Sequence, residues 1–175
     1  MITTQVPASA ISTLHDAAFY VLDKQEQIVE EAAPQPYNTA TLLQDAITLY
    51  GWSSSQVMQS AQWLFENGLI TYPRTDSTSC APEASDEARK IIVALYGADG
   101  LDRKKKWNTQ PHENGAHEAI RPTSSARYPH QLTEINEDSK KLYALIWKRF
   151  LAWHMIPATY RIITVELETD ETKGQ

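Results

Sequence analysis

Two side chains that could do chemistry together stand two positions apart within residues 69–77. Tyr72 ends a short apolar run with the pattern of a strand, Pro73 stops that pattern, and Arg74 follows. Side chains two residues apart on an extended chain project from the same edge. A phenol, with a reference pKa near ~10, is a poor nucleophile at neutral pH, but a guanidinium stabilises the phenolate and can hold a phosphate through two hydrogen bonds. The pair therefore indicates phosphoryl transfer, although a lone strand-end tyrosine is more often a packing residue.

A second group of chemically active side chains lies in residues 113–123. His117, Glu118 and Arg121 fall within five positions, and Gly115 and Pro122 interrupt the stretch too much for a plain helix face. A histidine, a carboxylate and an arginine this close together can hold or move protons and bind phosphate. This group strengthens the functional interpretation of Tyr72.

Residues 69–77 and 116–123 resemble the two signature segments of the type IA DNA topoisomerases, in the same order and at a compatible separation. The resemblance runs from about Phe19 to the C-terminus. It implies that Tyr72 attacks the scissile phosphate and becomes joined to the 5′ side of a break in one DNA strand. It also implies that Arg74 holds the nonbridging oxygens of that phosphate and that His117 holds a neighbouring phosphate.

Further DNA contacts are expected around these segments. A basic cluster at residues 103–106, which includes Lys104 and Lys105, precedes Trp107, and charge beside a stacking ring is typical of surfaces that follow a nucleic-acid backbone. A solvated loop is the alternative for this cluster. The remaining candidates for DNA binding are Asp76, Ser77, Glu118 and Arg121. Asp76 could instead orient Arg74 or His117, and an ion pair between Glu118 and Arg121 that holds the loop is the favoured alternative for those two residues.

The composition limits the classes of protein to which the chain can belong. The chain has 175 residues, 42% hydrophobic and 22% charged, which is typical of a globular domain, and no apolar run has the length of a membrane span. The net charge of -6 argues against a nucleic-acid binder, but residues 69–127 are close to neutral and the acidic excess lies elsewhere. A single cysteine, Cys80, fits a reducing compartment, so a cytoplasmic location is expected.

Periodicity predicts a strand over residues 19–30 and a linker over residues 32–36. Asn38 or Thr39 then caps a helix that runs to Tyr50, and Gly51 ends it. Ser53 and Gln56 form a capping box for a second helix that ends before Gly68. Two helices with so short a connection predict a helix-turn-helix, directly followed by the Tyr72 strand.

The rest of the chain predicts a third helix from Pro82, a loop over residues 97–108, a long helix from Thr133 to Pro157 and a strand over residues 158–167. The expected fold is mostly α with flanking β (α+β), the tyrosine-bearing domain of the type IA topoisomerase fold. The predicted parts are a tail (1–15), a flanking strand of the gate domain (16–36), the helix-turn-helix catalytic domain (37–130), and a flanking helix and strand of the gate domain (131–175). The flanking strands should pair with each other or with partners outside the chain.

The resemblance also sets expectations about cofactor and partners. The family's Mg²⁺ site has an Asp-x-Asp-x-Glu pattern in a separate domain, and this chain has no such run, so none of its residues is expected to bind a metal. We expect the chain to be part of a larger enzyme that uses Mg²⁺, binds single-stranded DNA and contacts its own further domains, but no membrane.

Two other classes of function are compatible with the sequence. A non-enzymatic helix-turn-helix DNA-binding module is the first alternative, because a helix, a turn, a second helix and a strand would also occur in a winged-helix regulator. The second predicted helix carries neither Lys nor Arg between Ser54 and Asn67, which weakens it as a recognition helix. A structural or protein-interaction fragment is the second alternative.

Overall fold

The computed structural model describes residues 18–103 and 118–169, so the predicted tail lies outside the described residues. The chain divides into two compact units. One unit, here called the helical unit, is Ala32–Ala158. The other contains the strands that precede and follow the helical unit in the sequence. In the described residues, four α-helices and one two-stranded sheet agree with the predicted α+β class.

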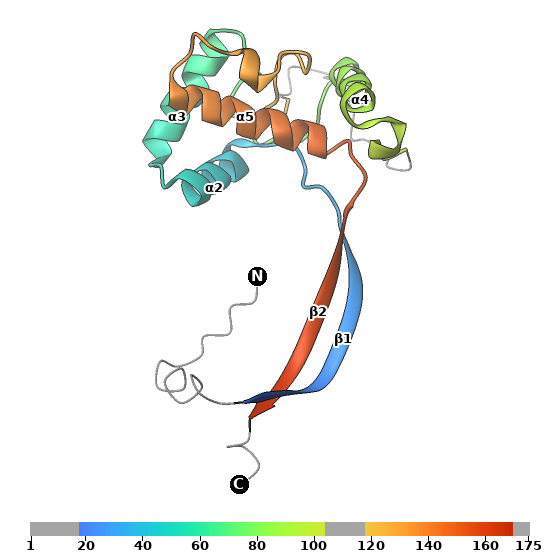
Figure 1. Ribbon diagram of the computed structural model, residues 1–175. Helices are drawn as coiled ribbons and strands as arrows, with labels where there is room; N and C mark the ends of the chain where they lie inside the picture. Colours follow the sequence, from blue (N-terminus) through green and yellow to red (C-terminus); the bar gives the residue numbers. More distant parts are fainter. Residues whose placement is uncertain (1–17, 104–117, 170–175) are drawn as a thin grey trace. The chain divides into compact units, whose positions relative to one another are not determined.

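The two strands form a ribbon. Strands β1 (Phe19–Glu31) and β2 (Ala158–Thr169) pair with each other and run in opposite directions (Figure 1). Both predicted strands, and their pairing, are therefore confirmed. The apolar side chains of this ribbon, such as Tyr20, Ile28 and Ile163, are exposed, and a single pair of strands is only marginally stable in water.

The helical unit begins with two capped helices, α2 (Thr39–Tyr50) and α3 (Ser54–Glu66). The Asn38 side chain accepts a hydrogen bond from the Thr41 N–H, and Gly51 ends α2 in the left-handed conformation with a φ of 68°. Ser53 caps α3 by accepting from the Gln56 N–H. The predicted reciprocal bond of the capping box, from the Ser53 N–H to the Gln56 side chain, was wrong, because only the bond from the Gln56 N–H to the Ser53 side chain is formed. The Gln56 side-chain amide donates to Asp138, 2.8 Å away.

The remaining helices complete the unit. Helix α4 (Pro82–Tyr96) starts at the predicted proline and is followed by two short 3-10 helices, η1 (Ala98–Gly100) and, later in the chain, η3 (Pro129–Gln131). Helix α5 (Glu137–Ala152) begins later than the predicted Thr133, because Asn136 is the residue whose side chain accepts from the Ser139 N–H and caps the helix. Among the described helices, none combines the length and apolar character that crossing a bilayer requires.

Helix α5 is the centre of the packing. It contacts α2, α3 and α4, with α2 and α3 beside one half of it and α4 near its other end (Figure 1). Its fully buried Leu142, Tyr143 and Ile146 belong to the same hydrophobic core cluster as Leu64 of α3. The contacts thus place α5 in the same unit as α2, α3 and α4, whereas the predicted boundary at residue 131 assigned it to a neighbouring domain. The assignment of the parts to gate and catalytic domains stays a prediction.

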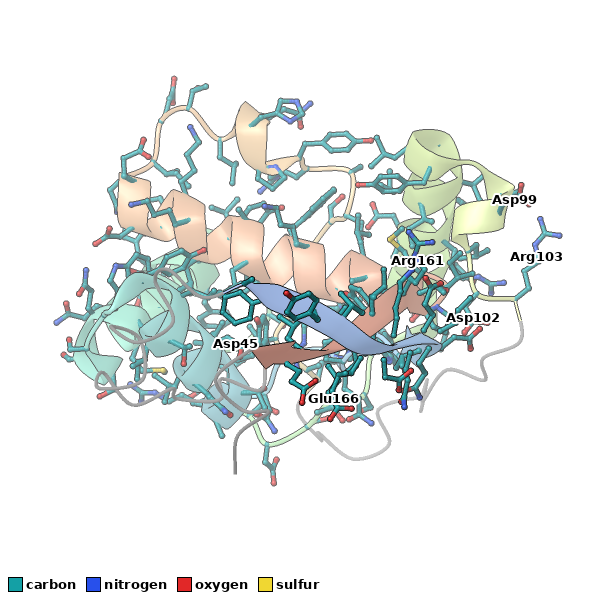
Figure 2. The ribbon with its side chains drawn as sticks, turned by 60° about the horizontal axis from the view of Figure 1, so that its bottom comes forward. Asp45, Asp99, Asp102, Arg103, Arg161 and Glu166 are labelled. Carbon is teal, nitrogen blue, oxygen red and sulfur yellow. The ribbon has the colours of Figure 1, made fainter. Side chains whose placement is uncertain are left out.

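A polar cluster joins α2, α5 and the chain that leads into α2. The buried Tyr37 hydroxyl donates to Asp45 Oδ2 over 2.6 Å, and Arg149 Nη1 pairs with the same oxygen at 3.0 Å. Arg149 Nε also donates to the Gln35 carbonyl, and its guanidinium lies 4.5 Å from the centre of the Tyr37 ring. Figure 2 shows Asp45 on α2. The cluster therefore ties the entry of the helical unit to α5.

Candidate active site

The two signature segments lie side by side, although about fifty residues separate them in the sequence. Ile70 and Pro122 form an isolated antiparallel bridge. On either side of it, the Thr71 N–H donates to the Arg121 carbonyl at 2.9 Å and the Thr123 N–H donates to the Leu69 carbonyl at 3.0 Å. The backbone pairing therefore brings residues 69–71 and 121–123 together.

The predicted strand before Tyr72 was wrong in extent, because the pairing consists of a single bridge rather than a ladder. Proline has no N–H to donate, so Pro122 cannot extend the pairing on one segment and Pro73 cannot extend it on the other. Gly68 precedes the bridge with a φ of 66°, a left-handed conformation that lets the chain reverse after α3. Tyr72 therefore sits at the exit of a short paired segment.

The Thr71 side chain adds to the backbone pairing. Its hydroxyl donates to the Ala119 carbonyl at 2.7 Å and accepts from the Arg121 N–H at 2.9 Å. Ala119 in turn donates its N–H to the Ser79 carbonyl, and the Ile120 N–H donates to the Tyr37 carbonyl. The residue next to Tyr72 is thus fixed to the second signature segment by both backbone and side chain.

Tyr72 itself is half-buried and packs against the end of α3. Its ring lies edge-on to Phe65, with 5.3 Å between the ring centres and 71° between the planes. Phe65 belongs to the last turn of α3, so the helix fixes one side of the tyrosine ring.

Arg74 lies in a loop that is anchored to the start of α2. The Thr39 hydroxyl donates to the carbonyls of Pro73 and Thr75 at 2.8 and 3.0 Å and accepts from the Thr75 N–H at 2.9 Å. The Thr39 N–H also donates to the Thr75 carbonyl. The backbone around Arg74 is thus held on both sides, while its side chain is exposed.

Arg74 lines two open grooves. The larger, here called the α3 groove, has a volume of about 670 Å³ and runs along α3. The smaller, of about 400 Å³, lies at the start of α2. The α3 groove is lined by Ser54, Ser55, Met58, Gln59, Gln62, Trp63, Glu66 and Arg74. Sequence reasoning missed its α3 residues, and their spacing of three and four along one helix face was the signal that could have found them.

Glu118 and Arg121 form the ion pair that was the favoured alternative to DNA contact. Arg121 Nε and Nη2 lie 2.6 and 3.0 Å from the two carboxylate oxygens of Glu118. Arg121 Nη1 donates to the Pro122 carbonyl, and Glu118 Oε2 also accepts from the Ala81 N–H at the start of α4. The exposed fractions of the Arg121 and Glu118 side chains are only 11% and 20%.

Two further predicted DNA-binding residues lie in the loop after Arg74. Asp76 is exposed, and its carbonyl accepts from the Asn38 side chain at 3.4 Å. Ser77 is half-buried, and its hydroxyl lies 2.9 Å from that of Ser79. The predicted His117, Lys104, Lys105 and Trp107 lie outside the described residues.

A metal site and a cysteine nucleophile are two other types of site for which the described residues give no support. Within residues 18–103 and 118–169, no group of three or more His, Cys, Asp or Glu side chains is placed to hold a metal ion. Cys80 is buried, and burial raises the pKa of its thiol to about 12. A thiol with so high a pKa carries almost no thiolate at neutral pH, so Cys80 is unsuited to act as a nucleophile.

Comparison with known proteins identifies the family. A DNA topoisomerase family model matches residues 2–175, so the chain belongs to this family, and it corresponds to a type IA topoisomerase segment. DNA topoisomerase 1 of Thermotoga maritima is 38% identical over 163 residues, which cover 87% of this chain and 26% of that protein. DNA topoisomerase 1 of Escherichia coli is 35% identical over 158 residues, which cover 90% of this chain and 18% of that protein.

A solved structure agrees with these relatives. The structure of full-length topoisomerase I from Thermotoga maritima matches with a TM-score of 0.73 and 36% identity, covering 96% of this chain and 28% of that one. The chain thus spans between 18% and 28% of the length of these relatives. The comparisons favour a topoisomerase over a stand-alone DNA-binding module.

Proposed function

We propose that this chain carries the nucleophile of a type IA DNA topoisomerase, which cleaves and rejoins one DNA strand through a 5′-phosphotyrosine intermediate. The observation that carries the proposal is the pairing of the two signature segments at Ile70 and Pro122, directly before Tyr72. Family membership supplies the reaction class. The pairing supports the assignment to Tyr72, because it brings both signature segments to one place.

In the proposed reaction, the Tyr72 oxygen attacks a backbone phosphorus and the 3′ oxygen of the preceding deoxyribose leaves. The tyrosine proton is lost and the departing 3′ oxygen gains one, so a phosphodiester and a phenol become an aryl phosphodiester and a 3′ hydroxyl. Attack of that hydroxyl on the same phosphorus reverses the reaction, and the bond energy is conserved. This reversibility is what changing DNA topology requires.

Arg74 is proposed to hold the nonbridging oxygens of the phosphate under attack. Its exposure and its anchored backbone suit this role, because an exposed guanidinium can reach a phosphate while the anchored backbone holds the base of the side chain in place. His117 is proposed to hold a neighbouring phosphate. Asp76 and Ser77, with the basic residues Lys104 and Lys105 and the ring of Trp107, are proposed to line the path of a single strand.

We also propose that α2 and α3, joined at residues 51–53, form a helix-turn-helix that supports the reacting tyrosine. Phe65 of α3 packs on the Tyr72 ring, and Thr39 of α2 anchors the loop of Arg74. The absence of Lys and Arg from α3 weighs against its use as a recognition helix in a duplex groove. The motif would then serve to position the tyrosine.

The proposed parent enzyme uses Mg²⁺ bound by another domain. The described residues do not form a site that fits this ion, so no step of the reaction is assigned to it here. Single-stranded DNA and the further domains of the parent are the proposed partners. A cytoplasmic location stays a prediction.

A denaturing gel of labelled single-stranded DNA tests the proposal. We expect the isolated chain to accumulate no covalent adduct, with or without Mg²⁺, because its described residues form no group of three or more side chains placed to bind a metal ion. The full-length protein should form the adduct and relax supercoiled DNA, and the Tyr72→Phe variant, which loses only a hydroxyl, should do neither. The matched control is Tyr96→Phe, which changes an exposed tyrosine on α4.

Two results would contradict the proposal. An adduct that persists in the full-length Tyr72→Phe variant would place the nucleophile elsewhere. Efficient adduct formation by the isolated chain would show that the proposed division of work between this chain and a metal-binding domain is wrong.

A further inference from the structure

Each of the three guanidinium nitrogens of Arg121 donates a hydrogen bond to the protein, and these bonds use three of its five N–H groups. Nε and Nη2 donate to the two carboxylate oxygens of Glu118 at 2.6 and 3.0 Å, and Nη1 donates to the Pro122 carbonyl at 3.0 Å. With 11% of the side chain exposed, little of the fork is left to meet a ligand. A phosphate contact needs an outward-facing fork, as at the exposed Arg74. Arg121 is therefore poorly suited to bind DNA.

The pair connects two parts of the fold. On one side, Glu118 Oε2 accepts from the Ala81 N–H, which belongs to the residue that caps α4. On the other side, the Arg121 carbonyl accepts from the Thr71 N–H, and the Arg121 N–H donates to the Thr71 hydroxyl. A continuous series of bonds thus runs from the start of α4 through Glu118 and Arg121 to Thr71, the residue before Tyr72.

We propose that Glu118 and Arg121 are a positioning pair that fixes the backbone on which Tyr72 is carried, and that neither side chain is a DNA ligand. The consequence for catalysis rests on the proposed function, because it requires Tyr72 to react. The expected effect on the backbone does not rest on the proposed function, because it concerns only the hydrogen bonds of Thr71 and Arg121.

The chemistry of the pair explains why these two residue types are needed. A bidentate arginine–carboxylate contact fixes the direction of both side chains, whereas lysine offers a point charge without a fixed direction. The pair is mostly buried, so solvent screens it less than it would an exposed pair. Glu118→Gln keeps the size of the side chain and loses its charge, and Arg121→Lys keeps the charge and loses the fork.

Amide hydrogen exchange in the 175-residue chain tests the effect on the backbone. We expect Glu118→Gln and Arg121→Lys to accelerate exchange of the Thr71 and Arg121 amides about tenfold, through local opening. Exchange of the Ile146 amide in α5 should change less than twofold. A matched control is Glu87→Gln, because the Glu87 carboxylate also joins α4 to a loop, accepting from the Ser124 hydroxyl and the Ser125 N–H at 2.7 Å each.

In the Glu87→Gln control we expect faster exchange of the Ser125 amide and no change in the exchange of the Thr71 amide. Equal acceleration at Thr71 in Glu118→Gln and Glu87→Gln, or uniform acceleration over the whole helical unit, would overturn the positioning role. If one variant does not fold, the other still decides the question, because each breaks the pair from a different side.

Single-turnover cleavage by the full-length protein tests the effect on Tyr72. We expect both pair variants to cleave single-stranded DNA about tenfold more slowly at saturating enzyme, with a Kd within twofold of wild type. The dependence of Kd on salt should be unchanged. Weaker binding with a salt slope lower by about one would show that Arg121 binds a phosphate, and it would overturn the proposal. If the wild-type protein fails to cleave, the proposed function fails, and the positioning of the backbone is still judged by the exchange experiment.

Discussion

The cluster of Tyr37, Asp45 and Arg149 offers a quantitative test of how the helical unit is held together. Asp45→Ala removes the acceptor of the buried Tyr37 hydroxyl and the partner of Arg149. A buried hydroxyl without an acceptor costs about 1 to 3 kcal/mol. The ion pair adds about 0.2 to 1 kcal/mol, because Asp45 is 36% exposed and Arg149 keeps its bond to Gln35. We expect a total loss of about 1 to 4 kcal/mol in the free energy of unfolding.

Urea unfolding followed by tryptophan fluorescence measures this loss. The described tryptophans, Trp52, Trp63, Trp147 and Trp153, all belong to the helical unit, so the signal reports on that unit. A change in the midpoint urea concentration at a constant slope m is a change in stability. The value of m therefore also shows whether the variant unfolds in the same way as the wild type.

A double-mutant cycle with Tyr37→Phe separates the two contributions. In the Tyr37→Phe background no hydroxyl is left without an acceptor, so Asp45→Ala should cost less than about 1 kcal/mol. The expected coupling between the two positions is therefore about 1 to 3 kcal/mol, the cost of the hydroxyl without an acceptor. Equal costs of Asp45→Ala in both backgrounds would refute the reasoning, since the hydroxyl would then not depend on Asp45.

Three further predictions use the same unfolding assay. Ile146→Ala, at a fully buried position on α5, should cost about 2 to 5 kcal/mol, whereas Ile156→Ala, at a half-exposed position, should cost less than about 1. Gly51→Ala should cost about 1 kcal/mol through backbone strain alone, because φ is 68° and nothing lies within 4 Å of the added carbon. Gly51→Asn should cost less, since asparagine tolerates this conformation, and an equal cost would contradict the explanation. Burial raises the pKa of Tyr143 to about 12, so its contribution to stability should be complete below about pH 10 and fall as the pH rises to 12, and Tyr143→Phe should weaken that fall.

The helix ends were the most predictable part of the fold, because their signals are local. Asn38, Ser53 and Gly51 perform the roles that their residue types predict. The start of α5 was missed because both Thr133 and Asn136 are acceptable caps, and only the bond from the Ser139 N–H distinguishes them. The bond of Gln56 to Asp138 joins positions 82 residues apart, and no local pattern predicts it.

The candidate site was predictable as a set of residues but not as an arrangement. The two signature segments identified Tyr72 and Arg74, and the pairing of those segments depends on bonds of Thr71 and Arg121 across fifty residues. The predicted strand failed because each segment carries a proline where a ladder would need a donor. The spacing of the α3 groove residues identifies one face of the helix, but it does not show that Arg74 lies beside that face, so the groove was missed.

Bonds hold the chain at both ends of residues 103–117. Before this stretch, the Asp102 N–H donates to the His154 carbonyl, and after it, Glu118 and Ala119 are bonded to Ala81 and Ser79. Figure 2 shows Asp99, Asp102 and Arg103 on the segment that follows α4. Both ends of the stretch are therefore held in place by the backbone of the helical unit, at His154 on one side and at Ser79 and Ala81 on the other.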